Sequence, residues 1–244
     1  MQQNSLKQKN PHYFVDIGNT SCVVVKIELG TLGSREVFYD RQAFLDWLSG
    51  QKEQVVWIAS VCPSLDIVIQ QLGLKNLYFI HYLDIPLKLD RFEDPSCIGI
   101  DRLLGAFGAY HRYKRTCLIV DSGSAITLCK VSQTGVYEGG VIVPGLEMAA
   151  KALDHFTDKV PKVALKSPKS LLGTSTETAV HSGLVYGLTY LLNGFIAACK
   201  KQDSEPLCVL ATGQGLELIE DSLDIDAIEP DLVFEGMKAL LKPI

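Results

Sequence analysis

The hydrophobic positions of the chain fall into short runs that alternate between the repeat of a strand and the repeat of a helix. The first two runs, YFVDIG and CVVVKIEL, are rich in β-branched residues and flank Gly18-Asn19, which is typical of a β-hairpin. Helical spacing follows at about 41–49 and 63–72, and the strand-like runs VVWIAS and LYFI lie between and after these segments. This alternation predicts a layered α/β domain.

A second hairpin, CLIVDSGSAITLCK, repeats the pattern of the first. VDSGS and its continuation match VDIGN and its continuation, so that Asp121 corresponds to Asp16. A repeat of this length predicts two duplicated α/β halves that face each other across a cleft holding the ligand. We expect an N-terminal extension at 1–12, a first half at 13–115 and a second half at 116–244.

The remaining elements complete the two halves. A helix at about 99–113 closes the first half. After the second hairpin we expect EGGVIVPG, a helix near 146–156, a long helix after Thr176, a strand at LCVLATG and a closing helix near 231–240.

The long helix invites a membrane interpretation. From Thr178 to Cys199 there is no formal charge, and the stretch is long enough to span a bilayer. It also contains His181, Tyr190 and several hydroxyl or amide side chains. We therefore expect a helix buried inside a soluble protein or its dimer interface, and no membrane partner.

The composition and net charge exclude several classes of protein and of binding partner. The 244 residues are 47% hydrophobic and 21% charged, which is typical of a globular chain. The net charge of −5 argues against nucleic acid or an anionic membrane surface as the main partner. Seven cysteines without a C-x-x-C pair, and a polar N-terminus without an apolar run, lead us to expect reduced thiols and a cytoplasmic location.

Each hairpin carries an Asp-x-Gly turn suited to phosphate chemistry. Gly18 allows backbone N–H groups to approach phosphate oxygens, and Asp16 can hold Mg²⁺ beside them. Asp121 repeats this geometry, with Ser124 and Thr127 as hydroxyls within reach of a phosphate or a metal-bound water. Either turn is also compatible with an ordinary hairpin. Two acidic strand ends meeting in one cleft would require cations or donors, which favours phosphoryl transfer.

Other segments carry weaker signals. In GIDR, Asp101 and Arg102 lie at a helix start, where an aspartate cap and a surface arginine are the plain alternative. The position after the last strand of the first half would aim Asp101 into the cleft. The glycines of GGVIVPG and LATGQG allow backbone to lie against a nucleotide base, or simply form turns.

From Tyr13 to Gly215 the chain resembles the type III pantothenate kinases and the related Bvg accessory factor proteins. The resemblance rests on six features in this order: DIGNT, GIDR, DSGSAIT, GGVIVPG, the Thr176 helix start and LATGQG. The resemblance implies an α/β fold of duplicated RNase H-like domains of the acetate and sugar kinase, Hsp70 and actin superfamily. It implies a homodimer with active sites at the interface. It also implies ATP-dependent phosphorylation of pantothenate to 4'-phosphopantothenate, with Mg²⁺ and a monovalent cation, K⁺ or NH₄⁺.

The resemblance also assigns roles to residues. Asp101 matches the proton acceptor, Asp121 the monovalent-cation ligand, and Asp16 lies near Mg²⁺. The implied ATP-binding residues are Asp16, Ile17, Gly18, Asn19, Thr20, Ser21, Cys22, Val23 and Ser124. The implied pantothenate-binding residues are Phe92, Gly99, Ile100, Asp101, Arg102 and Thr176, the last supplied across the dimer.

The chain departs from the family pattern at several positions. Ser124 and Ile126 stand where the family has threonines, and Gly213-Gln214-Gly215 stands for paired glycines. Phe92 replaces an aromatic hydroxyl, and one lost hydrogen bond weakens substrate affinity by about 0.5–1.5 kcal/mol without abolishing chemistry. Two alternatives remain: a catalytically weak regulatory or binding protein of the same fold, and a kinase of another small molecule.

Overall fold

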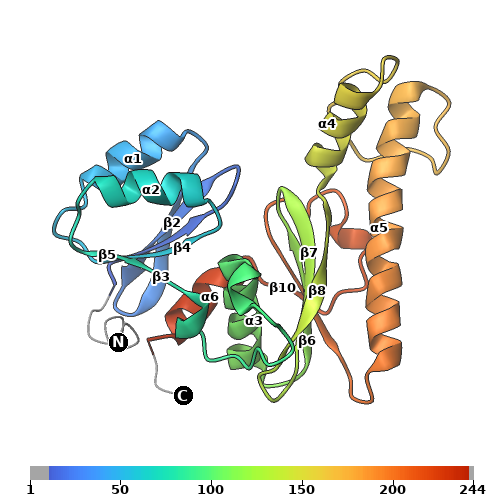
Figure 1. Ribbon diagram of the computed structural model, residues 1–244. Helices are drawn as coiled ribbons and strands as arrows, with labels where there is room; N and C mark the ends of the chain where they lie inside the picture. The colour runs from blue at the N-terminus through green and yellow to red at the C-terminus, as the bar shows by residue number, and fades with distance from the viewer. Residues whose placement is uncertain (1–10, 242–244) are drawn as a thin grey trace. The chain divides into compact units, whose positions relative to one another are not determined.

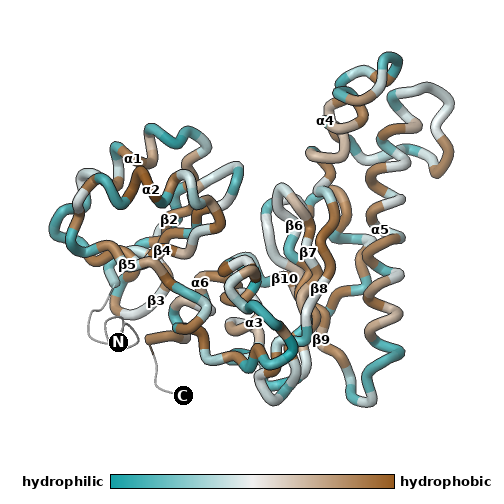
Figure 2. The backbone as a smooth tube through the Cα atoms, in the orientation of Figure 1, coloured by the Kyte–Doolittle hydropathy of each residue, from teal (hydrophilic) through white to brown (hydrophobic). Residues whose placement is uncertain are grey.

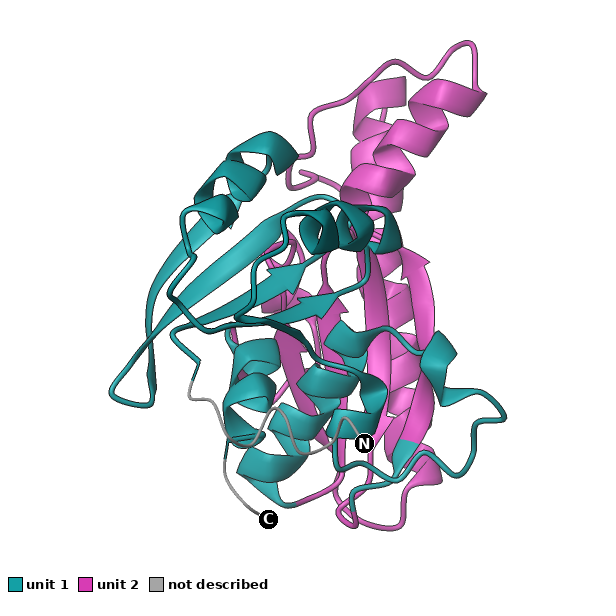
Figure 3. Ribbon diagram, turned by 60° about the vertical axis from the view of Figure 1, so that its left-hand side comes forward, with its two compact units in different colours: residues 1–114, 135–137, 231–244 teal, residues 115–134, 138–230 magenta. Residues whose placement is uncertain are grey.

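The structure is a computed structural model that describes residues 11–241, and it divides into two compact units (Figure 3). The first unit contains the chain up to Lys114, Gly135–Tyr137 and the chain from Asp231. The second contains Arg115–Thr134 and Glu138–Pro230. Most of the expected N-terminal extension, residues 1–10, lies outside the described residues. His12 is described, and its backbone N–H donates to Val55 O at 2.8 Å beside the first sheet.

The first unit is built on a five-stranded sheet in the order β3-β2-β1-β4-β5 (Figure 1). The central strand β1 is antiparallel to β2 and parallel to β4. The predicted hairpin and both later strands are confirmed, whereas β3 was not predicted from the sequence. The strands are β1 (Tyr13–Ile17), β2 (Cys22–Glu28), β3 (Thr31–Phe38), β4 (Val56–Ser60) and β5 (Leu77–Phe79).

Helices cover both faces of this sheet. Alternation along β1 turns Val15 and Ile17 toward α1 (Arg41–Ser49) and α2 (Pro63–Gln71), where they join Phe44 in one core cluster. Phe14 and Asp16 point to the other face. Helix α3 (Ile100–Tyr113) contacts β4, and α6 (Leu232–Ala239) contacts β1. In Figure 2 the hydrophobic colour runs along β4, consistent with a strand buried on both faces.

The second unit repeats this topology. Its strand order, β10-β9-β6-β7-β8, again has a central strand, β6, antiparallel to β7 on one side and parallel to β9 on the other. The predicted duplication is therefore confirmed, although β10 was not predicted. The strands are β6 (Cys117–Ser122), β7 (Ala125–Val131), β8 (Tyr137–Pro144), β9 (Cys208–Thr212) and β10 (Ala227–Ile228).

Two helices accompany the second sheet, α4 (Leu146–Phe156) and α5 (Thr176–Gln202). Val185, Leu192 and Ile196 of α5 pack into the core cluster of this unit. Among residues 11–241, α5 is the helix long and apolar enough to cross a membrane by length and composition, with a mean hydropathy of 1.3 and 28% of the window buried. The core helix of a soluble protein passes the same test, and the contacts of α5 are those of a helix packed on a sheet.

Helix α6 differs from the expected organisation. We expected residues 116–244 to form the second half, but α6 packs against α3 in the first unit. The two helices meet through glycines: a Cβ added at Gly236 would clash with Leu104 O, and one at Gly108 would clash with Leu232 O. Helix α6 therefore belongs to the first unit, because it packs against α3 and β1.

We expect Gly236→Ala to lower the free energy of unfolding by about 1–3 kcal/mol, because the added methyl group must push α6 away from α3. Urea unfolding followed by circular dichroism measures the change. Gly105→Ala on α3 is the matched control, since its Cβ would meet nothing within 4 Å. The control should be neutral or stabilising by up to about 1 kcal/mol. Equal destabilisation by both substitutions would contradict this account of the helix contact.

Candidate functional site

The β1–β2 turn in the first unit presents polar groups at the end of the central strand. Gly18 N donates to Ser21 O at 2.9 Å and closes the turn, while Asn19 and Thr20 are exposed at its tip. Asp16 is half-buried one position before the strand ends. Such a turn offers backbone N–H groups to an anion, with a carboxylate at its base.

Several residues assigned to this turn by resemblance bury their side chains. Ile17, Cys22 and Val23 are buried, so only their backbone atoms remain for a ligand. Burial raises the pKa of the Cys22 thiol to about 11, which keeps it neutral at physiological pH.

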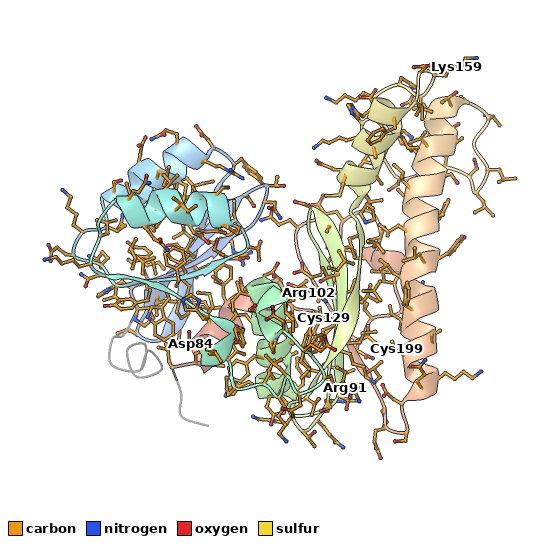
Figure 4. The ribbon with its side chains drawn as sticks, viewed as in Figure 1. Asp84, Arg91, Arg102, Cys129, Lys159 and Cys199 are labelled. Atoms are coloured by element: carbon orange, nitrogen blue, oxygen red, sulfur yellow. The ribbon has the colours of Figure 1, made fainter. Side chains whose placement is uncertain are left out.

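The start of α3 lies at the same edge of the first sheet. Val61 N donates to Ile17 O at 3.0 Å, and a Cβ at Gly99 would lie 3.6 Å from Val61 Cγ1. The GIDR segment is therefore a neighbour of the strand ends from which the β1–β2 turn emerges. Arg102, labelled in Figure 4, lies in the first turn of α3.

The carboxylate of Asp101 folds back over Gly99. A Cβ at Gly99 would lie only 2.5 Å from Asp101 Oδ1, so a side chain there would displace the carboxylate. Arg102 N donates to the same oxygen at 2.8 Å. Burial raises the pKa of Asp101, while the Arg102 N–H group and its positive charge act in the opposite direction. Asp101 is partly buried, because the helix start packs against the sheet edge.

Phe92 and Ile100 contribute mainly to packing. The Phe92 ring lies against the buried Tyr137 ring, with 5.6 Å between centroids. The Ile100 side chain is also buried, which leaves its backbone for any ligand contact. Of the residues that the resemblance implies in this part of the first unit, Asp16 and Asp101 carry carboxylates and Arg102 carries a guanidinium.

In the second unit, three glycine-containing segments meet at the end of β6. Gly215 N donates to Ser122 O at 2.8 Å, and Gly145 N donates to Ser124 O at 3.1 Å. A Cβ at Gly213 would lie 2.6 Å from Asp121 Oδ1. The sequence pattern singled out these glycines separately, and the structure brings them together around Asp121 and Ser124.

Thr176 lies elsewhere in the second unit, as the first residue of α5. Ser175, not Thr176, caps this helix, because Ser175 Oγ accepts from Thr178 N at 3.2 Å. The exposed Thr176 borders a cavity of about 780 Å³ between α4 and α5. The cavity is lined by Leu153, Val160, Gly173, Thr174, Ser175, Thr176, Ala179, Val180, Gly183 and Leu184.

Arg41 at the start of α1 was not singled out by the sequence pattern. Its guanidinium lies 3.5 Å from Asn19 O, at the tip of the β1–β2 turn. A basic residue at the first position of a helix, where cations are disfavoured, is the signal that would have drawn attention to it.

The chain is similar to proteins of one family along most of its length. A family model for type III pantothenate kinase matches residues 13–198. The type III pantothenate kinase of Persephonella marina is 34% identical over 88% of this chain and 91% of its own length. The type III pantothenate kinase of Caulobacter vibrioides is 37% identical over 88% of this chain and 95% of its own length. That of Phenylobacterium zucineum is 38% identical, over 64% of this chain and 60% of its own length.

Solved structures establish the fold. A crystal structure from Campylobacter jejuni, described as a Baf family transcriptional activator, superposes with a TM-score of 0.66 at 22% identity, covering 94% of this chain and 96% of that chain. MreB 5 of Spiroplasma citri superposes with a TM-score of 0.51 at 11% identity, and the superposition covers 94% of this chain and 96% of that chain. With the repeated strand order, these likenesses confirm the predicted α/β fold of two duplicated RNase H-like domains. Because the family model and two relatives match most of its length, the chain belongs to the type III pantothenate kinase family.

Proposed function

We propose residue roles for the function that family membership assigns to this chain, the ATP-dependent phosphorylation of pantothenate in coenzyme A biosynthesis. The observation that carries these roles is the placement of Asp101 at the sheet edge from which the β1–β2 turn emerges. Transfer of a phosphoryl group to a hydroxyl requires two parts, a turn that binds the phosphates and a group that accepts the hydroxyl proton.

Asp101 is proposed as the proton acceptor. The hydroxyl oxygen of pantothenate forms a bond to the γ-phosphorus of ATP, and the bond between that phosphorus and the bridging oxygen of ADP breaks. The hydroxyl proton passes to the Asp101 carboxylate. A partly buried carboxylate with a raised pKa is a better base than a fully solvated one, because its ionised form is less stabilised. Arg102 and the backbone at Gly99 and Ile100 are proposed to orient pantothenate.

The β1–β2 turn is proposed to bind the phosphates of ATP. Backbone N–H groups from Asn19 to Ser21 donate to phosphate oxygens, with Asp16 at the base of the turn. Within residues 11–241 no group of three or more His, Cys, Asp or Glu side chains gathers to hold an ion. Asp16 would supply a carboxylate oxygen to Mg²⁺, an ion that usually keeps waters and phosphate oxygens as its other ligands. When bound, Mg²⁺ neutralises charge on the transferring phosphate.

Asp121 is proposed as the ligand of a monovalent cation, and Ser124 as an ATP contact. The space beside Gly213 that a Cβ would fill is bordered by Asp121 Oδ1 and Ser122 O, two oxygens of the kind that K⁺ prefers. When bound, the cation offsets the charge of Asp121 and of nearby phosphates. The neighbouring glycine segments leave backbone surface open to a nucleotide.

A homodimer in the cytoplasm completes the proposal. One face of α5 packs on its sheet, while Tyr190, Leu191 and Phe195 are 59%, 41% and 38% exposed. Large apolar side chains exposed together on one helix favour a protein partner, and a second copy of this chain is the partner we propose. Thr176 would then be available to pantothenate across the dimer. The seven free cysteines agree with a reducing compartment.

The function is tested by measuring ADP release with ATP, Mg²⁺, K⁺ and pantothenate. We expect turnover that requires pantothenate and falls when K⁺ is replaced by a larger organic cation such as tetramethylammonium. Release of ADP with a sugar or another carboxylate but not with pantothenate would indicate a kinase of another small molecule. A folded dimer without turnover on any of these acceptors would instead support a regulatory protein of this fold.

Asp101→Asn should lower kcat about 10²–10⁴-fold, because the amide cannot accept the hydroxyl proton. Its free energy of unfolding at pH 7 should stay the same or rise. Burial raises the folded-state pKa of Asp101, so its charged form opposes folding above that pKa, and the opposition disappears below the unfolded-state value. Thermal unfolding and steady-state kinetics measure the two effects.

Asp66→Asn is the matched control for this substitution. Asp66 also lies in the first turn of a helix, and burial also raises its pKa, but it lies on α2. The control should retain kcat. Parallel loss of activity and stability in Asp101→Asn, or an inactive control, would count against the catalytic role.

Phe92→Tyr should restore a hydroxyl that the family usually carries, and we expect the KM for pantothenate to fall about 2–10-fold. The KM for ATP should not change, because the substitution touches only the acceptor site. Phe79→Tyr, on β5 of the same unit, is a control for the general effect of an added hydroxyl. A decrease in both KM values, or none in either, would remove Phe92 from the pantothenate site.

A further inference from the structure

Arg41 connects helix α1 to the β1–β2 turn. It is the first residue of the helix, and the preceding Asp40 caps the helix by accepting from Gln42 N at 2.9 Å. One terminal nitrogen of the guanidinium, Nη2, lies 3.5 Å from Asn19 O and 3.5 Å from Cys62 Sγ. The side chain thus reaches from α1 across to the tip of the turn.

The charge of Arg41 lacks a matching anion in this surrounding. Both contacts are at the long end of the hydrogen-bond range, one to a neutral carbonyl and one to a thiol. Throughout the described part of the chain, no carboxylate lies within ion-pair distance of Arg41. Arg35 of the same unit, by contrast, pairs with Asp231. The guanidinium therefore retains donors and charge for a ligand.

The position of Arg41 is also electrostatically unfavourable for folding. The first turn of α1 contains no acidic residue. A cation at the positive end of a helix dipole destabilises the helix. Helix stability therefore does not account for an arginine at this position, whereas an anion bound beside the turn would be attracted by both the guanidinium and the helix end.

The Cys62 thiol is the second group in contact with this guanidinium. It lies at the N-terminal end of α2, and its Sγ is 3.5 Å from Ser64 Oγ. The Ser64 hydroxyl is the main cause that lowers the pKa of the Cys62 thiol, and the nearby Arg41 charge acts in the same direction. A phosphate, which carries more charge than a thiolate, would gain more from the same guanidinium.

We propose that Arg41 is a nucleotide-binding residue whose guanidinium holds a phosphate group of the ATP bound at the β1–β2 turn. This inference rests on the proposed function, in which that turn binds ATP. A guanidinium can donate two parallel hydrogen bonds to a phosphate and still face the Asn19 carbonyl. It would thereby fix the position of the turn and of the phosphate together.

The test compares Arg41→Gln and Arg41→Lys with the unmodified protein. Titration calorimetry gives the Kd for the non-hydrolysable analogue AMPPNP with Mg²⁺ and for adenosine, and kinetics give both KM values. Arg41→Gln should raise the Kd for AMPPNP and the KM for ATP about tenfold, the usual size of a lost charge-assisted hydrogen bond. Arg41→Lys should recover part of the affinity, because it keeps the charge but not the paired donors.

Two readouts separate a phosphate contact from a structural role. Affinity for adenosine and the KM for pantothenate should stay unchanged in both variants, since neither ligand carries the phosphates. Arg112→Gln is the matched control: it removes an exposed arginine from the last turn of α3, at the opposite end of that helix from Asp101. The control should match the unmodified protein in every measurement.

The outcomes are distinct for the two proposals. If the unmodified protein does not bind AMPPNP, the proposed function fails. If it binds AMPPNP and Arg41→Gln binds equally well, the role of Arg41 fails while the function stands. If Arg41→Gln weakens the binding of adenosine and of AMPPNP to the same extent and lowers the melting temperature, Arg41 stabilises the fold instead. The inference is then likewise overturned.

Discussion

The burial of one central strand in each sheet is the constraint on which the site depends. Strands β1 and β6 pair on both edges and have few exposed positions, so their side chains are almost all apolar. A charged residue can be accommodated only at the end of such a strand, where water and the backbone of a turn replace the hydrophobic core. Asp16 and Asp121 occupy this position in the two units, and each is followed by a hairpin turn.

The same constraint explains why glycine surrounds these carboxylates. At the end of β6, segments from three parts of the chain approach so closely that a Cβ at Gly213 or Gly145 would meet backbone or carboxylate oxygen. At the start of α3, Gly99 leaves room for the Asp101 carboxylate. Glycine therefore shapes both places by removing atoms. At the end of β6 the space it leaves is bordered by backbone carbonyl and carboxylate oxygens, which are the ligands that hard cations prefer.

Desolvation and the neighbouring positive charge shift the pKa of Asp101 in opposite directions. Packing of the helix start against the sheet edge raises its pKa, and the Arg102 N–H group and charge partly offset that effect. A fully exposed carboxylate would be a weaker base, while a fully buried one without donors would stay protonated. Arg41 shows a related compromise, since its charge is unfavourable at a helix start and suited to an anion beside it.

Local patterns in the sequence determined both hairpins, their acidic turns, the start of α3 and the duplication, because strand alternation and turn chemistry depend on residues close together in the chain. The bounds of α1 and α4 were likewise predictable from apolar spacing. Strands β3 and β10 were not, since β3 is largely exposed and β10 has only two residues. Only the tertiary structure decided that α6 returns to α3, that Asp101 is partly buried, and that Arg41 reaches Asn19. Each of these depends on contacts between distant segments, whose free energy comes from packing and desolvation that no local pattern records.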